Sequence, residues 1–140
     1  MTKIDRICII DDDPITVFGI RKMLNLVVAC DNIKAFVNGK LAFDAIKKTF
    51  EEEGKVPDVI FLDINMPIMD GWQFLEAFIA LPIQQEVRVN VVTSSIDPFD
   101  IQKWENYKRK TKHTISFNNK PIRKEDIAKM TVESVIHKNV

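Results

Sequence analysis

Five polar side chains in this sequence each stand at the end of a predicted β-strand, and their types suit phosphoryl chemistry. They are Asp11, Asp12, Asp63, Thr93 and Lys120. Clustered carboxylates repel one another and favour a hard divalent cation such as Mg²⁺. A lysine supplies a point charge for a phosphoryl group, and a threonine supplies a hydroxyl donor. Because a carboxylate can attack phosphorus, the set predicts a phosphoryl-transfer site with a carboxylate acceptor.

Short apolar runs alternate with amphipathic stretches along the chain. The pattern predicts strands at residues 7–10, 33–36, 59–62, 87–92 and 114–117, and helices at residues 14–26, 39–50, 72–80, 98–108 and 124–137. Such alternation is typical of βα units that form a parallel sheet with helices on both faces. We therefore expect an α/β protein with the flavodoxin-like (βα)5 fold, a doubly wound five-stranded parallel sheet in the order 2-1-3-4-5.

The predicted sheet brings the five polar side chains to one place. The carboxyl ends of parallel strands share one edge of the sheet, and the first, third and fourth strands are neighbours in the expected order. Ligands of such sheets bind at this edge, where the strand order reverses. The carboxylates, the hydroxyl and the ammonium should therefore line a single crevice.

Composition and charge exclude several classes of function. Lys and Arg together number 20, as do Asp and Glu, and this balance argues against a nucleic-acid binder. We find no stretch long and apolar enough to span a membrane, and the charged N-terminus is unlike a signal peptide. The cysteines, Cys8 and Cys30, make neither a disulfide framework nor a zinc site. We expect a cytoplasmic protein in which Cys8 is a buried structural thiol.

Four segments at the ends of these strands form a specific combination. They are residues 9–14 (IIDDDP), 57–71 (PDVIFLDINMPIMDG), 92–94 (VTS) and 120–121 (KP). Together, and in this order, they resemble the response-regulator receiver domain of two-component signalling. The resemblance covers about residues 4–137 and implies one receiver domain over residues 1–140, with no effector domain.

The resemblance implies a metal-assisted phosphoacceptor site. Asp63 would be the phosphoacceptor and one of the metal ligands, and Asp12 would bind Mg²⁺ (or Mn²⁺) directly. Asp11 would act mainly through coordinated water, and the backbone carbonyl of Asn65 would complete the protein's share of the metal ligands.

The resemblance also implies a switch. Thr93 would bond a phosphoryl oxygen, and Lys120 would pair with the same group. Phe117 matches the family's switch aromatic, although a phenylalanine cannot hydrogen-bond and a plain core role stays open. Pro121 matches a proline whose preceding peptide bond is commonly cis. The chain departs from the family in residues 118–119, two asparagines where apolar residues are common.

The expected function is that of a signalling phosphoacceptor rather than an enzyme. A histidine kinase or a histidine phosphotransfer protein would donate the phosphoryl group. The receiver would assist its own phosphorylation and dephosphorylation. Output to an unknown downstream protein would use the face built by the fourth helix, fifth strand and fifth helix, and we expect no nucleic-acid or membrane partner.

Two alternatives stay open. An aspartyl-phosphate phosphatase of the haloacid-dehalogenase type also uses Asp, Thr, Lys and Mg²⁺. Its nucleophile follows the first strand in an Asp-x-Asp-x-Thr/Val pattern, which Asp11, Asp13 and Ile15 match only in part. The other alternative is a degenerate receiver that serves only for docking.

The remaining polar residues have structural interpretations. We expect Asp13 to cap the helix that follows it, and residues 70–71 (Asp-Gly) to supply turn chemistry. His113 and His137 belong to no cluster, and we expect both to be solvent-exposed.

Overall fold

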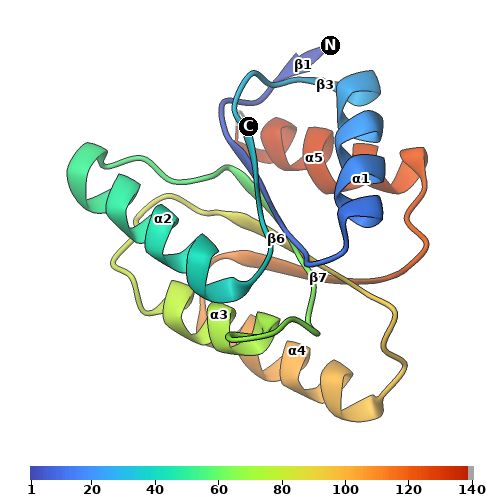
Figure 1. The fold of residues 1–140 in the computed structure, drawn as a ribbon. Helices are drawn as coiled ribbons and strands as arrows, with labels where there is room; N and C mark the ends of the chain where they lie inside the picture. The colour runs from blue at the N-terminus through green and yellow to red at the C-terminus, as the bar shows by residue number, and fades with distance from the viewer. Residues whose placement is uncertain (139–140) are drawn as a thin grey trace.

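A five-stranded parallel sheet forms the middle layer of the protein, with helices on both of its faces (Figure 1). The computed structural model describes the backbone of residues 1–138 and the side chains of residues 1–131. The strands of the sheet are β2 (Ile7–Ile10), β4 (Ile33–Phe36), β5 (Val59–Leu62), β6 (Arg88–Thr93) and β7 (Thr114–Asn119). The helices are α1 (Pro14–Val27), α2 (Gly39–Glu53), α3 (Gly71–Ile79), α4 (Pro98–Lys110) and α5 (Lys124–Lys138).

The order of the strands determines which loops meet. It is β4-β2-β5-β6-β7, with every pair parallel. Counted along the chain, these five strands have the order 2-1-3-4-5, so the predicted flavodoxin-like fold is confirmed. Because β2, β5 and β6 are neighbours, the segments that follow them lie side by side at the carboxyl edge.

Both faces of the sheet are apolar, as expected for a parallel sheet covered on both sides. In Figure 1, α1 and α5 cover one face of the sheet, and α2, α3 and α4 cover the other. Ile7 and Ile9 belong to the apolar cluster that includes residues of α1 and α5, whereas Cys8 and Ile10 belong to the cluster that includes residues of α2, α3 and α4. Burial raises the pKa of the Cys8 thiol to about 12. The interpretation of Cys8 as a buried structural residue is therefore confirmed.

Polar caps fix where the helices begin. Asp13 caps α1, and its carboxylate accepts hydrogen bonds from the backbone N–H of Ile15 and the hydroxyl of Thr16, which lower its pKa. Asp70 caps α3 in a reciprocal pair with Gln73. The structural interpretations of Asp13 and of residues 70–71 are thus confirmed.

Among the described residues, no helix is both long and apolar enough to cross a membrane.

Two local features differ from the prediction. A separate two-stranded sheet joins β1 (Thr2–Lys3) to β3 (Val28–Ala29), and strands this short carry no readable pattern. The last strand, β7, continues to Asn119 rather than ending at Phe117. Asparagine disfavours strands, but the amide of Asn118 donates to the carbonyl of Val91 at 3.1 Å and so extends the pairing.

The expectation of an exposed His113 was wrong. Its side chain is buried, and its Nδ1 accepts a hydrogen bond from the backbone N–H of Val87 at 2.9 Å. The ring also packs against Phe78. Burial, with a smaller effect of the nearby Lys112 charge, lowers the pKa of His113, while Glu86 opposes this change. A lone histidine beside a strand gives no sequence pattern that predicts such a contact; the side chain of His137 lies outside the described side chains.

His113 should make the fold less stable in acid. The folded state keeps His113 neutral to a lower pH than the unfolded state, whose histidine binds a proton below about pH 6.5. The free energy of unfolding should therefore fall as the pH falls from about 6.5 through the lowered pKa. Urea melts of wild type and His113→Gln between pH 5 and 7.5 measure this slope. A wild-type slope equal to that of His113→Gln would contradict the prediction.

Candidate functional site

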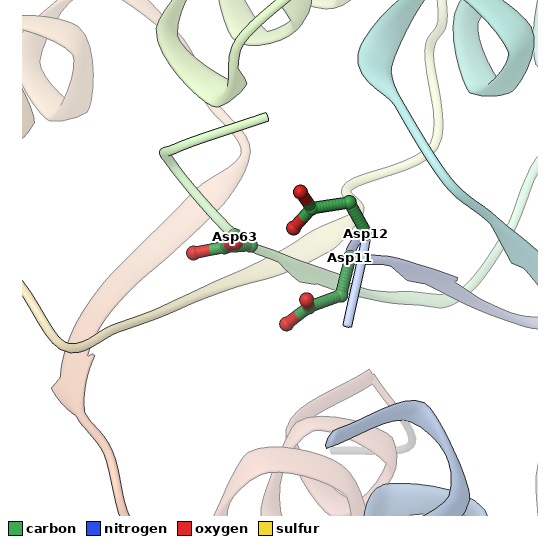
Figure 2. A group of neighbouring side chains, drawn as sticks. All are labelled: Asp11, Asp12 and Asp63. Carbon is green, nitrogen blue, oxygen red and sulfur yellow. The ribbon is translucent and has the colours of Figure 1, made fainter. Parts of the chain in front are cut away.

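Three carboxylates lie together at the carboxyl edge of the sheet (Figure 2). Asp11 and Asp12 follow β2, and Asp63 follows β5. Each offers an oxygen atom, and the three oxygens lie within 4.8 Å of one another. Asp11 is 3% exposed and Asp63 is 7% exposed, whereas Asp12 is open to solvent. The cluster is therefore a largely buried pair of acids with a third, exposed acid beside it.

Backbone hydrogen bonds hold two of these acids in place. The N–H of Asp63 donates to the carbonyl of Ile10 at 2.9 Å, and the N–H of Asp11 donates to the carbonyl of Phe36 at 3.0 Å. The Oδ1 atom of Asp63 accepts from the N–H of Ile64 at 2.9 Å. The first two bonds continue the sheet pairing by one residue, so the backbone positions of Asp11 and Asp63 follow from the strand register. The bond from Ile64 then orients the Asp63 carboxylate.

Gly71 packs directly against the backbone of Asp63. Its N–H donates to the carbonyl of Ile64 at 2.8 Å, and a Cβ atom at this position would lie 2.3 Å from the carbonyl oxygen of Asp63. Only glycine allows so close an approach. The sequence indicated turn chemistry at residues 70–71, but not this contact, which forms between segments brought together by the fold.

Lys120 lies between the two buried acids. Its Nζ is 3.1 Å from Oδ2 of Asp11 and 3.9 Å from Oδ1 of Asp63. The lysine follows β7, and its backbone N–H donates to the carbonyl of Thr93 at 2.8 Å. The peptide bond between Lys120 and Pro121 is cis, as the resemblance predicted. The structure thus places one cation against two of the predicted acids.

Asp63 is the acid whose ionisation changes most clearly. Its pKa is raised to about 6, first by burial and then by the charge of Asp11. Lys120 opposes this rise without cancelling it, and Asp12 adds a smaller repulsion. The carboxyl group of Asp63 is therefore ionised at neutral pH, at a cost to stability.

We expect the ionisation of Asp63 to lower the stability of the metal-free protein as the pH rises from about 4 to 6. The folded state holds the Asp63 proton up to its raised pKa of about 6, whereas the unfolded chain releases it near pH 4. The free energy of unfolding should drop by about 1–3 kcal/mol on this account. Urea melts in EDTA, compared between wild type and Asp63→Asn, measure the drop.

Two comparisons sharpen this measurement. Asp12→Asn should change the slope less than Asp63→Asn, because Asp12 is exposed and makes the smaller contribution to the shift. Mg²⁺ should restore stability above pH 6, because it binds the folded cluster and not the unfolded chain. A wild-type curve that rises from pH 4 to 6 by as much as that of Asp63→Asn would contradict the assignment.

The resemblance names three further residues, Thr93, Phe117 and Asn65. Thr93 is the last residue of β6 and is fully buried, and its Oγ1 accepts from the N–H of Ser95 at 3.0 Å. Phe117 is half-buried, with its ring centroid 5.8 Å from that of Trp104. Asn65 is exposed, two residues beyond Asp63. The roles of all three stay predictions.

The donor set fits a hard divalent cation. All three side chains offer carboxylate oxygens, the ligands that Mg²⁺ and related ions take in proteins. Their spacing of 4.8 Å or less allows more than one to reach a single ion. Burial is the main cause of the raised pKa of Asp63, but the charges of Asp11 and Asp12 add to it, and a bound cation would relieve this repulsion. The cluster of Asp11, Asp12 and Asp63 could therefore hold a metal ion.

A doubly wound parallel sheet with three carboxylates and a lysine at its carboxyl edge is the arrangement expected of a receiver domain. The sequence profile of the response regulator receiver domain matches residues 7–132, and the chain belongs to this family. The family predicted from the four segments is thereby confirmed. Receiver domains are signalling phosphoacceptors of two-component systems, and they generally bind Mg²⁺ at an acidic pocket.

Individual relatives agree with this assignment. An uncharacterized response regulatory protein of Vibrio cholerae is 32% identical over 113 residues, which cover 80% of this chain and 38% of that protein. Sporulation initiation phosphotransferase F of Bacillus subtilis is 32% identical over 92 residues, 64% of each chain. The chain thus spans less than two thirds of either relative. A two-component response regulator from Cytophaga hutchinsonii shares the fold, with a TM-score of 0.79, 24% identity and coverage of 96% of this chain and 98% of its own.

Proposed function

We propose that the protein is a phosphoacceptor in a two-component phosphorelay and that Asp63 receives the phosphoryl group. The observation that carries the proposal is that Asp63 lies beside Asp11 and Asp12 and that the Lys120 ammonium contacts both Asp11 and Asp63. With a pKa of about 6, Asp63 is ionised and nucleophilic at neutral pH. An oxygen of Asp63 forms a bond to phosphorus as the bond between phosphorus and the donor's histidine nitrogen breaks.

The neighbouring residues bind and orient the transferred group. Lys120 pairs with its negative charge, and Thr93 donates its hydroxyl to a phosphoryl oxygen. Four residues would hold Mg²⁺ (or Mn²⁺). Asp12 would bind the ion directly and Asp11 mainly through water, together with Asp63 and the backbone carbonyl of Asn65. When bound, this ion neutralises charge on the phosphoryl oxygens. Phosphorylation of Asp63 should therefore require a divalent cation, since the acids alone repel the phosphoryl group.

Exposed apolar side chains on the segments that follow β2 and β5 support a protein as the donor. Ile15 and Phe18 stand on the first turns of α1 and are 79% and 68% exposed, and Ile68, between β5 and α3, is 81% exposed. A groove joins Phe18 to Asp11 and Asp12. Such apolar exposure indicates a protein contact. A histidine kinase or histidine phosphotransfer protein docked there would bring its phosphohistidine to Asp63.

The proposal also covers binding of a downstream protein and removal of the phosphoryl group. Phosphorylation changes the face formed by α4, β7 and α5, which binds a downstream protein in the cytoplasm. The receiver promotes hydrolysis of its own acyl phosphate. One receiver domain spans the chain, and it acts as a signalling component rather than as an enzyme on an outside substrate.

Intact mass after treatment with acetyl phosphate and Mg²⁺, followed by peptide mapping, tests the proposal. The expected result is one phosphoryl group per chain, located at Asp63 and lost when EDTA replaces Mg²⁺. A phosphoryl group at Asp11 or Asp13 would favour the phosphatase alternative. Failure to incorporate any phosphoryl group would favour a receiver that only docks.

A further inference from the structure

Ser95 fixes the segment between β6 and α4 through both its backbone and its side chain. Its N–H donates to Oγ1 of Thr93 at 3.0 Å, and its carbonyl accepts from the amide of Asn119 at 2.9 Å. Its hydroxyl donates to Oδ2 of Asp100 and accepts from the N–H of Asp97 at 3.2 Å. The residue that contacts the Thr93 hydroxyl is therefore tied at once to β7 and to α4.

Asp100 extends this connection to a third element. Its Oδ1 accepts from the indole N–H of Trp72 at 2.9 Å, so one carboxylate holds Ser95 with one oxygen and α3 with the other. Trp72 is 5% exposed, and its ring stacks on Tyr107 of α4 with centroids 5.7 Å apart. Hydrogen bonds to an ionised carboxylate are stronger than those between neutral groups. A continuous chain of contacts thus runs from Thr93 through Ser95 and Asp100 to Trp72.

These hydrogen bonds oppose movement of Thr93. If Thr93 turns toward a phosphoryl group on Asp63, its Oγ1 leaves the N–H of Ser95 or draws Ser95 with it. In the second case the contact between Ser95 and Asp100 must break. The energy of these contacts therefore stabilises the unphosphorylated arrangement relative to the phosphorylated one.

We propose that Asp100 is a positioning residue that holds Thr93, through Ser95, in its unphosphorylated arrangement, and that its contact with Trp72 changes when Thr93 moves toward a phosphoryl group. The proposal rests on the proposed function of Asp63 as acceptor. Weakening the contact between Asp100 and Ser95 should make capture easier, because it removes stabilisation from the starting arrangement alone. The change is about three- to tenfold in affinity, the factor that one net hydrogen bond contributes to an equilibrium.

The two tryptophans provide separate signals for the test. The indole N–H of Trp72 donates to Asp100, whereas the indole N–H of Trp104 donates to the carbonyl of Ile115 and its ring contacts Phe117. A shift of the Trp72 indole resonance would show a change in the contacts through Asp100 and Ser95. A shift of the Trp104 indole resonance would show movement of Phe117. Nitrogen–proton spectra resolve the two side chains in one sample.

The experiment titrates beryllofluoride, with Mg²⁺, into wild type, Ser95→Ala and Asp100→Ala. Glu105→Ala removes an exposed carboxylate from the same helix and is the matched control. We expect the Trp72 indole resonance of wild type to shift on binding and the shift to disappear in Ser95→Ala. Affinity for beryllofluoride should rise about three- to tenfold in Ser95→Ala and Asp100→Ala and stay unchanged in Glu105→Ala.

The possible results separate this proposal from the function on which it rests. If beryllofluoride binds at Asp63 of wild type but the Trp72 resonance stays fixed, the proposal is wrong and the proposed function stands. A Trp72 shift that persists in Ser95→Ala, or an affinity unchanged or lowered in that variant, also overturns it. Ser95→Ala retains the bond between Trp72 and Asp100, so it decides the matter even if Asp100→Ala does not fold. Failure of wild type to bind beryllofluoride would overturn both.

Discussion

Asp63→Asn should incorporate no phosphoryl group from acetyl phosphate or from a phosphohistidine donor. The substitution keeps the size and the hydrogen bond from the N–H of Ile64, but it replaces the nucleophilic carboxylate with an amide. The fold should survive, and above pH 6 it should be more stable by about 1–3 kcal/mol in EDTA, since a buried charge with a raised pKa has been removed. Intact mass and urea melts measure the two effects.

Asp13→Asn is the matched control for this experiment. Asp13 adjoins the cluster in sequence, but its carboxylate caps α1, and asparagine caps a helix about as well. The variant therefore loses the same charge, yet it should be phosphorylated like wild type. Phosphorylation that persists in Asp63→Asn, or that disappears in Asp13→Asn, would show that the acceptor has been assigned to the wrong residue.

Gly71→Ala should damage both the fold and the site. The added methyl group would lie 2.3 Å from the carbonyl oxygen of Asp63 and 2.9 Å from Cα of Ile64, so backbone must move. We expect a loss of about 2–4 kcal/mol in the free energy of unfolding. Because a shift of about 1 Å in a reacting group can slow a reaction by about a hundredfold, labelling of Asp63 should slow by about tenfold to a hundredfold.

Gly19→Ala provides the opposite case within the same chain. Gly19 lies inside α1, and a Cβ atom there would meet no described heavy atom within 4 Å. Alanine favours a helix interior over glycine by about 0.5–1 kcal/mol, so this variant should be more stable than wild type and should label normally. Thermal and urea melts of the two variants decide the matter. Equal stabilities would mean that the packing of Gly71 against Asp63 is looser than described.

The sequence predicted the frame of the protein well because its signals are local. The apolar runs of β2 and β5 and the caps of α1 and α3 are readable within a few residues. Once the parallel order is inferred, the meeting of Asp11, Asp63 and Lys120 at one edge follows from topology. The pattern of strands therefore predicted both the fold and the acids of the site.

The features that sequence reasoning missed all depend on contacts between distant segments. His113 meets Val87 across 26 residues, and Trp72 meets Asp100 across 28. Nothing in the sequence around His113 or Asp100 distinguishes such a contact from a solvent-exposed side chain. The position of Gly71 likewise becomes restrictive only when α3 begins directly against the backbone of Asp63.

The packing of α4 implies uneven local stability across the protein. Within this helix, all of whose side chains are described, none is fully buried, whereas α3 contains five buried residues. Segments with little buried apolar surface open at a lower free energy than the whole molecule. Amide hydrogens of α4 should therefore exchange with solvent sooner than those of α3. The helix proposed to carry the output surface would thus be the one that reorganises without unfolding the core.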